Sequence, residues 1–581
     1  MKTNKQKLSI VGLLYKKAPR LLIFSVSVGA IAGALYSLII PFVIQGIAAE
    51  ADSGLAFSVA GVSFEFDQSS YAAMFFITVT AILFTKLGSV ILVNSIAKSA
   101  AADLKMSVAD TISRARTDSI ENVGFSRLLN ILSDDVNSVA NAAITIPLLV
   151  VSFVTILGML GYLAFLNISV FGIVVGAIVV GLFMFQLPVT LAQKKYEKAR
   201  AIKDVIQEGV RGLVMGAYEL KLNGKKSERF RKEELLDPVN RSVRLEKIAD
   251  AIFHFAGTSS DLLSFFIIGS VVFILPTYMT LDNAETYGVV MALLYIAGPL
   301  AHILGMMQQF KVGQIAMIRI EALYELEEEM QVTETDNIPP TWHSFGGDKL
   351  TYQYPNSSSD RTFSLAPISV DFKPGQVNFI VGGNGSGKTT LSKLLSLHYL
   401  PSSGNLYFDG VCIDRSNIAA ARERISVIYS DYYLFSKIYC DLATVDMGKV
   451  NTYLNMLGLS GKTELIDGRF TTTDLSDGQR RRLALMVALL EDKDIYVFDE
   501  WAADQDPTFK KIFYQSILPE MRKDNKLVIV ITHDDRYFNH ADRVITMEDG
   551  RVNSIQEIKS EALNRVIETK GTVFEPLAEM A

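Results

Sequence analysis

Two long stretches without a single charged residue constrain this chain more than any other feature. Residues 21–49 and residues 136–193 contain no Asp, Glu, Lys or Arg. A helix needs about 20 mostly apolar residues to cross the hydrocarbon core of a membrane, so both stretches are long enough to do so. The C-terminal part of the chain has an ordinary content of charge. The sequence therefore predicts a membrane domain followed by a soluble domain within its 581 residues.

Six apolar segments are candidates for membrane-spanning helices. They are residues 21–44, 71–97, 144–166, 170–191, 252–278 and 287–307. Lys and Arg are frequent before the first span and in the connection 194–247, whereas the loops 50–70 and 279–286 have none. Because basic residues mark cytoplasmic loops, we expect the N-terminus and everything after the sixth span to be cytoplasmic. The first apolar run is too long for a cleaved signal peptide.

Two cytoplasmic connections, residues 98–135 and 194–247, are long and have a helical pattern. Each is predicted to consist of two membrane helices that extend into the cytoplasm and are joined by a short turn. The turns fall near residues 117–124 and 216–230, and we expect them to contact a soluble domain. A solvated hairpin is the alternative, but it explains only the charge of these segments and not their length.

A phosphate-binding pattern lies in the soluble half. Residues 382–389 read GGNGSGKT, which fits G-x-x-x-x-G-K-[ST] between a strand pattern and a helix pattern. The glycines allow backbone N–H groups to turn toward an anion, and the helix N-terminus adds positive potential. Lys388 is therefore predicted to reach the β- and γ-phosphates of a nucleotide, and Thr389 to hold Mg²⁺.

Two further strand patterns end in residues that suit nucleotide hydrolysis. Residues 495–498 are followed by Asp499, which would hold Mg²⁺ through water, and by Glu500, which would orient and polarise the attacking water. Residues 528–532 are followed by His533. A histidine alone is weak evidence, because most single histidines are structural.

Two other segments suit the binding of a nucleotide. Residues 475–479 read LSDGQ and open a helix, so the hydroxyl and backbone groups of Ser476 and Gly478 are predicted to form an additional anion site. An alternating strand pattern ends at Tyr354, whose ring is suited to stacking on adenine. A half-buried strand tyrosine is the alternative interpretation of Tyr354.

Taken in their order along the chain, from Tyr354 through the 382–389 loop, LSDGQ and Asp499-Glu500 to His533, these segments resemble the ATP-binding cassette, the ATPase domain of ABC transporters. The membrane half is similar to exporters that have fused membrane and ATPase domains, and residues 124–136 look like their first cytoplasmic loop. The resemblance implies an α-helical membrane domain of the exporter type followed by an α/β P-loop ATPase domain. It divides the chain into a six-helix transmembrane domain (1–325), a linker (326–345), a nucleotide-binding domain (346–553) and a C-terminal tail (554–581).

Three details of the sequence resemble those of one branch of these exporters. This branch exports cyclic peptides and siderophore precursors, and it includes the pyoverdine- and microcin-exporter-like proteins. Residues 475–485 read LSDGQRRRLAL, and residues 499–507 read DEWAADQDP where most drug and lipid exporters carry DEATSALD. The usual glutamine of the Q-loop is missing, since Ser430 takes its place and Asp431 follows. An oxygen atom of Ser430 or Asp431 is expected to reach Mg²⁺ or water.

The resemblance implies ATP and Mg²⁺ as cofactors. It also implies a homodimer in which ATP lies between the phosphate loop of one subunit and the LSDGQ segment of the other. The catalytic residues would be Glu500 and His533. The nucleotide contacts would be Tyr354, Gly382, Asn384, Gly385, Ser386, Gly387, Lys388, Thr389, Thr390, Ser476, Gly478, Gln479 and Asp506, and the metal ligands Thr389, Asp499, Ser430 and Asp431.

The predicted function is ATP-driven export of a peptide-like product across the bacterial inner membrane by alternating access. A cyclic peptide, a microcin or a peptide siderophore precursor would fit. The alternatives are a lipid or drug flippase or exporter, and an importer with the same architecture. A soluble cassette protein that only binds its partners is disfavoured by the membrane spans. Nucleic acid is not expected as a partner, because no basic patch with interleaved aromatic residues occurs.

Ionisable residues inside the predicted spans mark a candidate cargo cavity. Lys86 lies in the second span, His254 and Asp261 in the fifth and His302 in the sixth. A charge at the membrane centre costs about 2.5–3.5 kcal/mol on insertion scales, so such residues seldom face lipid. We expect them to line a cavity for a polar, peptide-like cargo. Alternatively, Lys86 and Asp261 pair and only hold the helices together.

Overall fold

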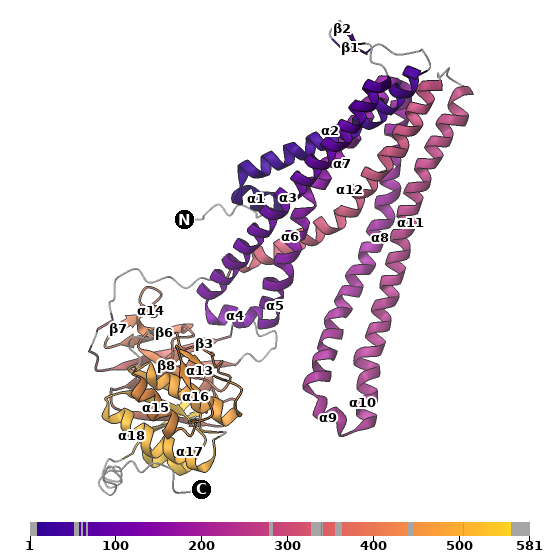
Figure 1. Cartoon of the computed structure of the whole chain (residues 1–581). Coiled ribbons are helices and arrows are strands. Elements are labelled where there is room, and N and C mark those ends of the chain that lie inside the picture. Colours follow the sequence, from indigo (N-terminus) through magenta and orange to yellow (C-terminus); the bar gives the residue numbers. More distant parts are fainter. Residues whose placement is uncertain are drawn as a thin grey trace. The chain divides into compact units, whose positions relative to one another are not determined.

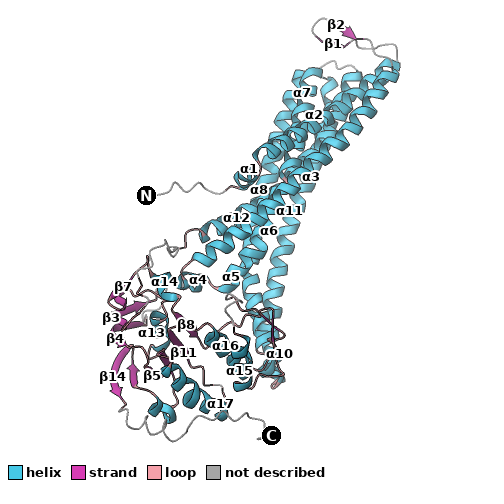
Figure 2. Cartoon of the chain, turned by 60° about the vertical axis from the view of Figure 1, so that its left-hand side comes forward, coloured by secondary structure: helices cyan, strands magenta, loops and turns pink. Residues whose placement is uncertain are grey.

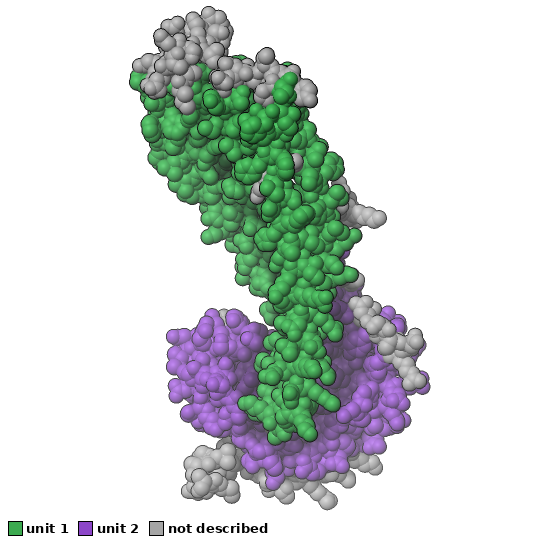
Figure 3. Space-filling view, turned by 90° about the vertical axis from the view of Figure 1, so that its right-hand side faces the viewer, with its two compact units in different colours: residues 1–109, 129–324 green, residues 110–128, 325–581 purple. Residues whose placement is uncertain are grey.

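The chain forms two compact units in its computed structural model (Figure 3). The first combines residues 1–109 with 129–324, and the second combines residues 110–128 with 325–581. The structure describes residues 9–50, 57–59, 62–64, 68–277, 283–326, 338–339, 341–354, 363–439, 446–503 and 505–558. Most of the predicted linker and nearly all of the predicted tail therefore lie outside the described residues.

Long helices build the first unit (Figure 1). The α-helices are α1 (Ile10–Lys17), α2 (Pro19–Glu50), α3 (Gln68–Arg114), α5 (Phe125–Asn130), α6 (Val136–Ile144), α7 (Ile146–Leu166), α8 (Ile168–Met215), α9 (Ala217–Lys221), α10 (Gly224–Phe230), α11 (Asp237–Gly269) and α12 (Asn283–Leu323), and of these the end of α3 and most of α5 belong to the second unit. Wider or tighter helical turns are η1 (Ile131–Asp135), η2 (Arg231–Leu236), η3 (Ser270–Ile274) and η4 (Leu275–Thr277), and the strands β1 (Phe57–Val59) and β2 (Val62–Phe64) form a small hairpin.

Five described helical segments are long and apolar enough to cross a membrane. They are Pro19–Gly46, Ser69–Arg114, Arg127–Leu166, Ile168–Met215 and Thr286–Leu323. The region of the predicted fifth span contains a shorter apolar segment, Phe265–Ile274, so a crossing there stays a prediction. The tight turn between α7 and α8 has a local cause, because Asn167 Oδ1 accepts hydrogen bonds from the N–H groups of Ser169 and Val170 and so caps α8.

Both long connections are helical hairpins, as the sequence predicts. In the first, α4 (Thr117–Val123) forms the turn between α3 and α5, and residues 110–128 belong to the second compact unit. This grouping confirms the predicted contact of the first turn with a soluble domain. In the second, α8 and α11 run side by side and are joined by α9 and α10 (Figure 1).

The second unit contains all the remaining strands (Figure 2). A four-stranded antiparallel sheet has the order β4 (Ser364–Phe372), β3 (Phe345–Gln353), β6 (Ser403–Phe408), β7 (Val411–Ile413). A six-stranded sheet has the order β14 (Arg551–Glu557), β13 (Arg543–Glu548), β5 (Val377–Gly382), β12 (Leu527–Ile531), β11 (Ile495–Asp499), β8 (Ile425–Ile428). A two-stranded pair joins β9 (Leu465–Ile466) to β10 (Arg469–Phe470). Strand β14 continues four residues into the predicted tail.

Helices complete the second unit. They are α13 (Lys388–Leu395), α14 (Ile418–Arg422), α15 (Met447–Met456), α16 (Asp477–Leu490), α17 (Pro507–Ile512), η6 (Phe513–Ile517), α18 (Leu518–Lys523) and η7 (Asp535–His540). The central strands β5, β11 and β12 are mostly apolar on both faces, apart from Asn378 and Asp499, and almost fully buried, as expected for parallel strands covered on both sides. Since β13, β5, β12, β11 and β8 are parallel, their carboxyl ends meet at one edge of the sheet.

Candidate nucleotide-binding site

The phosphate-binding loop connects β5 to α13 at that carboxyl edge. Two glycines show why the loop needs this residue type. Gly382 has φ 151°, and a Cβ there would lie 2.2 Å from the carbonyl oxygen of Met547. Gly387 has φ 96°, and a Cβ there would lie within 2.9 Å of the side chains of Leu365 and Phe363. Larger residues would therefore push the loop away from the sheet and out of its anion-binding conformation.

Lys388 lies inside the loop that it follows. Its ammonium group donates hydrogen bonds to the carbonyl oxygens of Gly382 and Gly383, both at 3.0 Å. Burial lowers the pKa of Lys388, and the negative charges of Glu500 and Asp499 oppose this shift. A buried cation at the N-terminus of a helix is suited to a phosphate ligand, as the sequence predicts. The other predicted loop residues, Asn384 and Gly385, are exposed at its tip.

Asp499 and Ser386 are suited to a hard cation. The Oδ2 atom of Asp499 and the hydroxyl of Ser386 are buried and have no hydrogen-bond partner among the described residues. Burial raises the pKa of Asp499 to about 6, Glu500 adds to the shift, and a hydrogen bond from Thr389 opposes it. Unsatisfied buried oxygen atoms are costly, and Mg²⁺ takes oxygen ligands. The donor set therefore fits Mg²⁺ held by Thr389 and Asp499 together with nucleotide phosphates.

Glu500 and His533 come together at the ends of neighbouring strands. His533 Nε2 lies 3.0 Å from Glu500 Oε1, and both side chains are partly open to solvent. Glu500 has φ 54°, a left-handed conformation that costs a residue with a side chain about 1–3 kcal/mol. Its N–H donates to Ile531 O, and its carbonyl accepts from Arg481 Nη1. These two backbone contacts hold the carboxylate at the end of β11, where the sequence places it.

The LSDGQ segment forms the N-terminus of α16. Ser476 is the N-cap, and its N–H donates to Gln479 Oε1 at 3.2 Å, which satisfies one of the free donors at a helix start. The carbonyl of Gly478 accepts from Gln505 Nε2 at 3.1 Å. Trp501 Nε1 donates to Arg481 O at 2.9 Å. Both Gln505 and Trp501 belong to the DEWAADQDP segment, so this segment fastens the region of Glu500 to the first turns of α16.

Tyr354 and Asp506 differ in how their side chains are used. The hydroxyl of Tyr354 lies 3.1 Å from Thr390 Oγ1, next to the phosphate loop, and its predicted stacking on adenine stays a prediction. Asp506 is the N-cap of α17, and its carboxylate accepts from the N–H groups of Thr508 and Phe509. The described contacts of Asp506 are therefore structural, and its predicted nucleotide contact stays a prediction.

The segment in place of the Q-loop follows β8, the neighbour of β11. Ser430 and Asp431 are exposed, and the charge of Asp431 contributes to the raised pKa of Asp499. The preceding Tyr429 is a residue that the sequence analysis missed. Its hydroxyl contacts Ser396 Oγ at 2.5 Å and His398 Nδ1 at 3.1 Å, directly after α13. Tyr429 thus ties the Q-loop segment to the phosphate-binding helix.

We expect Asp431→Ala to reduce cargo-stimulated ATP hydrolysis more than basal hydrolysis. A coupling contribution of about 0.5–2 kcal/mol corresponds to a roughly 2- to 30-fold loss of stimulation. Basal hydrolysis is retained because Asp499, Glu500 and Thr389 are intact. Ser430→Gln should be tolerated, because only the local oxygen ligand changes. The measurement is ATPase activity with and without cargo in lipid vesicles, and an equal loss of both activities would make Asp431 merely structural.

The first unit has a cavity of about 560 Å³ between α8, α11 and α12. Phe185 and Phe253 meet there edge to face with ring centres 6.1 Å apart, beside Val189 and Leu304. Charged side chains of both signs also line the cavity; they are Glu197, Lys203, Glu246 and Lys311. Lys203 and Glu246 form an ion pair of 2.8 Å. The cavity therefore combines an aromatic, apolar part with a charged part.

The four ionisable residues predicted for the cargo site do not line this cavity. Lys86 Nζ lies 3.3 Å from the hydroxyl of Tyr36 and 5.4 Å from the centre of its ring. His254 and His302 are exposed, and the side chain of Asp261 lies outside the described residues. Glu246 and Phe253 line the cavity from α11, where they lie two turns apart on the same face of the helix. His254 points about 100° away from that face, because it is the next residue along the helix. A cargo role for the four residues stays a prediction.

Comparison with known proteins agrees with this geometry. The ABC transporter family matches residues 365–503. The chain is 30% identical over 570 residues to the ATP-binding protein SyrD of Pseudomonas syringae pv. syringae, which covers 95% of this chain and 98% of SyrD. It is 26% identical over 474 residues to the ATP-dependent lipid A-core flippase of Paraburkholderia xenovorans (strain LB400), with 78% and 77% covered.

A solved structure has the same fold. The structure of a bacterial Atm1-family ABC exporter with ATP bound superposes with a TM-score of 0.74 at 15% identity and covers 95% of this chain and 97% of its own. The fold similarity therefore includes the membrane helices as well as the ATPase domain. Because the similarity to SyrD also runs along nearly the whole chain, the chain belongs to the ABC transporters, as an exporter whose membrane and ATPase domains are fused.

Proposed function

We propose that this exporter moves a peptide-like product across the bacterial inner membrane. The observation that carries the proposal is the cavity between α8, α11 and α12, in which an aromatic end adjoins side chains of both charge signs. A peptide-like molecule has apolar side chains together with polar amide and charged groups, so it complements both parts. The similarity of DEWAADQDP and LSDGQRRRLAL to the peptide- and siderophore-exporter branch supports the same cargo class.

Candidate peptides are expected to stimulate ATP hydrolysis by the full chain in lipid vesicles. Lys311→Ala should raise the peptide concentration for half-maximal stimulation by roughly 10- to 150-fold, because a lost charged hydrogen bond is worth about 1.5–3 kcal/mol. Lys86→Ala tests the earlier cargo prediction in the same way. Lys105→Ala, an exposed lysine of α3, is the matched control. If peptides stimulate the Lys311→Ala protein as strongly as the parent protein, this cavity does not bind the cargo.

The Lys203–Glu246 pair distinguishes a binding role from a structural one. Glu246→Ala leaves Lys203 without its partner in the cavity. Suppose that Glu246→Ala fails to fold, and that the double variant Lys203→Glu, Glu246→Lys restores both folding and peptide stimulation. The two residues are then structural. If the double variant folds but peptides do not stimulate it, the cargo requires a positive charge at position 203 and a negative charge at position 246.

A lipid flippase is the second candidate. The similarity to the ATP-dependent lipid A-core flippase of Paraburkholderia xenovorans (strain LB400) over 474 residues favours it. A flippase would be stimulated by lipid in vesicles without any peptide. Stimulation by lipid A headgroup variants, combined with no response to charged or zwitterionic peptides, would replace the peptide proposal with this one.

We also infer that the exporter works as a homodimer. The turn at the end of α8 exposes large apolar side chains: Met215 is 74% exposed, Tyr218 84% and Leu222 88%. A groove of about 560 Å³ beyond β8 is lined by the exposed aromatic residues Tyr433, Phe435 and Tyr439. Exposed apolar patches of this kind mark protein interaction sites. We propose that this turn of one subunit docks into the groove of the other.

The homodimer explains how hydrolysis is linked to transport. ATP held by Lys388 of one subunit would also contact Ser476 and Gly478 of the other, so ATP draws the two ATPase domains together. Mg²⁺ bound by Thr389 and Asp499 would neutralise phosphate charge during hydrolysis. Glu500 takes the proton of the attacking water, and His533 orients the Glu500 carboxylate. Loss of the γ-phosphate removes the shared ligand and releases the two domains.

A further inference from the structure

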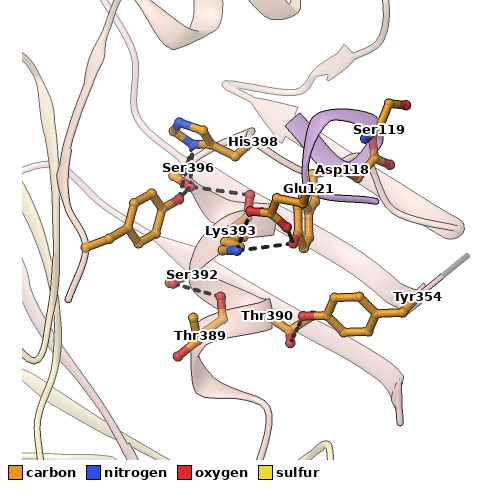
Figure 4. A network of polar contacts seen from close by, with 12 residues as sticks. Asp118, Ser119, Glu121, Tyr354, Thr389, Thr390, Ser392, Lys393, Ser396 and His398 are labelled. Carbon is orange, nitrogen blue, oxygen red and sulfur yellow. Dashed lines mark hydrogen bonds and ion pairs between the residues drawn. The ribbon is translucent and has the colours of Figure 1, made fainter. Parts of the chain in front are cut away.

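Glu121 of α4 joins the membrane-derived hairpin to the nucleotide-binding domain. Its Oε1 accepts from Lys393 Nζ at 2.9 Å, and its Oε2 accepts from the hydroxyl of Tyr399 at 2.5 Å (Figure 4). Lys393 lies on α13, the helix that begins at Lys388 of the phosphate loop. One carboxylate of the hairpin therefore contacts the phosphate-binding helix and a residue four positions after the end of that helix.

Tyr399 is the centre of an aromatic cluster. Its side chain is buried, and its ring stacks on Tyr352 with ring centres 4.6 Å apart. Tyr354 meets Tyr352 edge to face at 5.2 Å and Tyr399 edge to face at 6.1 Å. The hydroxyl of Tyr354 lies 3.1 Å from Thr390 on α13 (Figure 4). The position of the Tyr354 ring is thus set by Tyr352 and Tyr399 on one side and by α13 on the other.

The hydroxyl of Tyr399 accepts from Lys393 Nζ at 3.2 Å and donates to Glu121, so among the described residues of this cluster the carboxylate is the acceptor for its proton. Burial is the main cause that raises the pKa of Tyr399, and the hydrogen bond to Glu121 is the second. The phenol therefore keeps its proton and donates it to the hydrogen bond with the carboxylate. Charge-assisted hydrogen bonds of this type are about twice as strong as neutral ones. Removing the carboxylate would leave a buried hydroxyl donor unpaired, and such a group reorients its ring or admits water.

We propose that Glu121 is a positioning residue for adenine, and that it acts by holding Tyr399 and, through Tyr399, the ring of Tyr354. The inference rests on the proposed role of Tyr354 as the surface on which adenine stacks. Because α4 directly follows α3, a helix with a membrane span, a shift of the hairpin then changes the affinity for the base. By linkage, binding of the base stabilises one position of the hairpin to the same extent.

The test separates the base of ATP from its phosphates. The full chain in lipid nanodiscs is titrated with ATP and with inorganic tripolyphosphate, each displacing a fluorescent ATP analogue in the presence of Mg²⁺. Glu121→Ala is expected to raise the Kd of ATP about fivefold, the lower end of typical coupling between linked sites, with less than about a twofold change for tripolyphosphate. Asn122→Ala, the exposed neighbour on α4, is the matched control and should change neither.

Tyr399→Phe keeps the ring and removes only the donor, so it tests the proposal even if Glu121→Ala fails to fold. It should reproduce the selective loss of ATP affinity, and the Glu121→Ala, Tyr399→Phe double variant should lose no more than either single one. Equal weakening of ATP and tripolyphosphate would overturn the proposal, since Glu121 would then act through Lys393. Unchanged ATP affinity in both single variants would overturn it as well.

Tyr354→Leu shows which assumption is at fault. If Tyr354→Leu weakens ATP but not tripolyphosphate while Glu121→Ala and Tyr399→Phe do nothing, adenine stacking holds and the positioning role of Glu121 is wrong. If Tyr354→Leu also leaves ATP affinity unchanged, the adenine role of Tyr354 is wrong and the positioning proposal falls with it. Neither result affects the peptide proposal, which is read from stimulation by cargo.

Discussion

Glu500→Gln is expected to lower ATP turnover by about 10²- to 10⁴-fold, the usual contribution of a positioned general base, while ATP still binds. Glu500 is the carboxylate that follows the strand of Asp499 and contacts His533. Glutamine keeps the shape and the left-handed backbone of this position but cannot accept the proton of water. Lys388, Ser476 and Gly478 are unchanged, so the variant should accumulate as an ATP-bound, closed dimer.

Steady-state hydrolysis and nucleotide retention on the purified full chain measure this effect. Glu423→Gln, an exposed carboxylate of the same domain, is the matched control and should keep the parent rate. His533→Ala should reduce turnover less than Glu500→Gln, because the histidine acts on the carboxylate and not on water. Hydrolysis at the parent rate by Glu500→Gln would show that another residue is the base.

The candidate ATP site was predictable because its residues occupy short, contiguous motifs at the ends of strands. Lys388, Asp499 and His533 each follow an apolar strand pattern, and parallel strands bring such ends to one edge. The sequence therefore indicated the phosphate loop, Asp499 and the carboxylate after it without any knowledge of the sheet order. The fold class was predictable for the same reason, since charge-free runs and strand patterns are local properties.

Contacts between distant segments could not be predicted in this way. Glu121 is one of several acidic residues in the first hairpin, and its partners Lys393 and Tyr399 lie 272 and 278 positions away. Nothing in the local pattern distinguishes it from Asp103 or Asp110, which form ion pairs elsewhere. The cavity between α8, α11 and α12 depends on how helices pack, so the local sequence pattern does not identify the side chains that line it.

Trp501→Ala is expected to destabilise the ATPase domain by about 3–5 kcal/mol, the usual cost of truncating a buried tryptophan. The Trp501 side chain is 1% exposed, its ring lies 4.5 Å from that of Phe513, and its N–H donates to Arg481 O. For a domain of this size the loss corresponds to a thermal transition lowered by roughly 6–20 °C. The measurement is the unfolding transition of the ATPase domain in the purified full chain.

The substitution is informative because Ala is the residue that most drug and lipid exporters carry at this point of the motif. If that motif were interchangeable, Trp501→Ala would be neutral. We expect the opposite, because Phe513 and the carbonyl of Arg481 surround an indole that alanine cannot replace. Trp501→Phe keeps most of the volume and loses mainly the hydrogen bond, which is worth about 1 kcal/mol. A Trp501→Ala protein as stable as Trp501→Phe would show that the pocket collapses, and that Trp501 does not fasten Glu500 to α16.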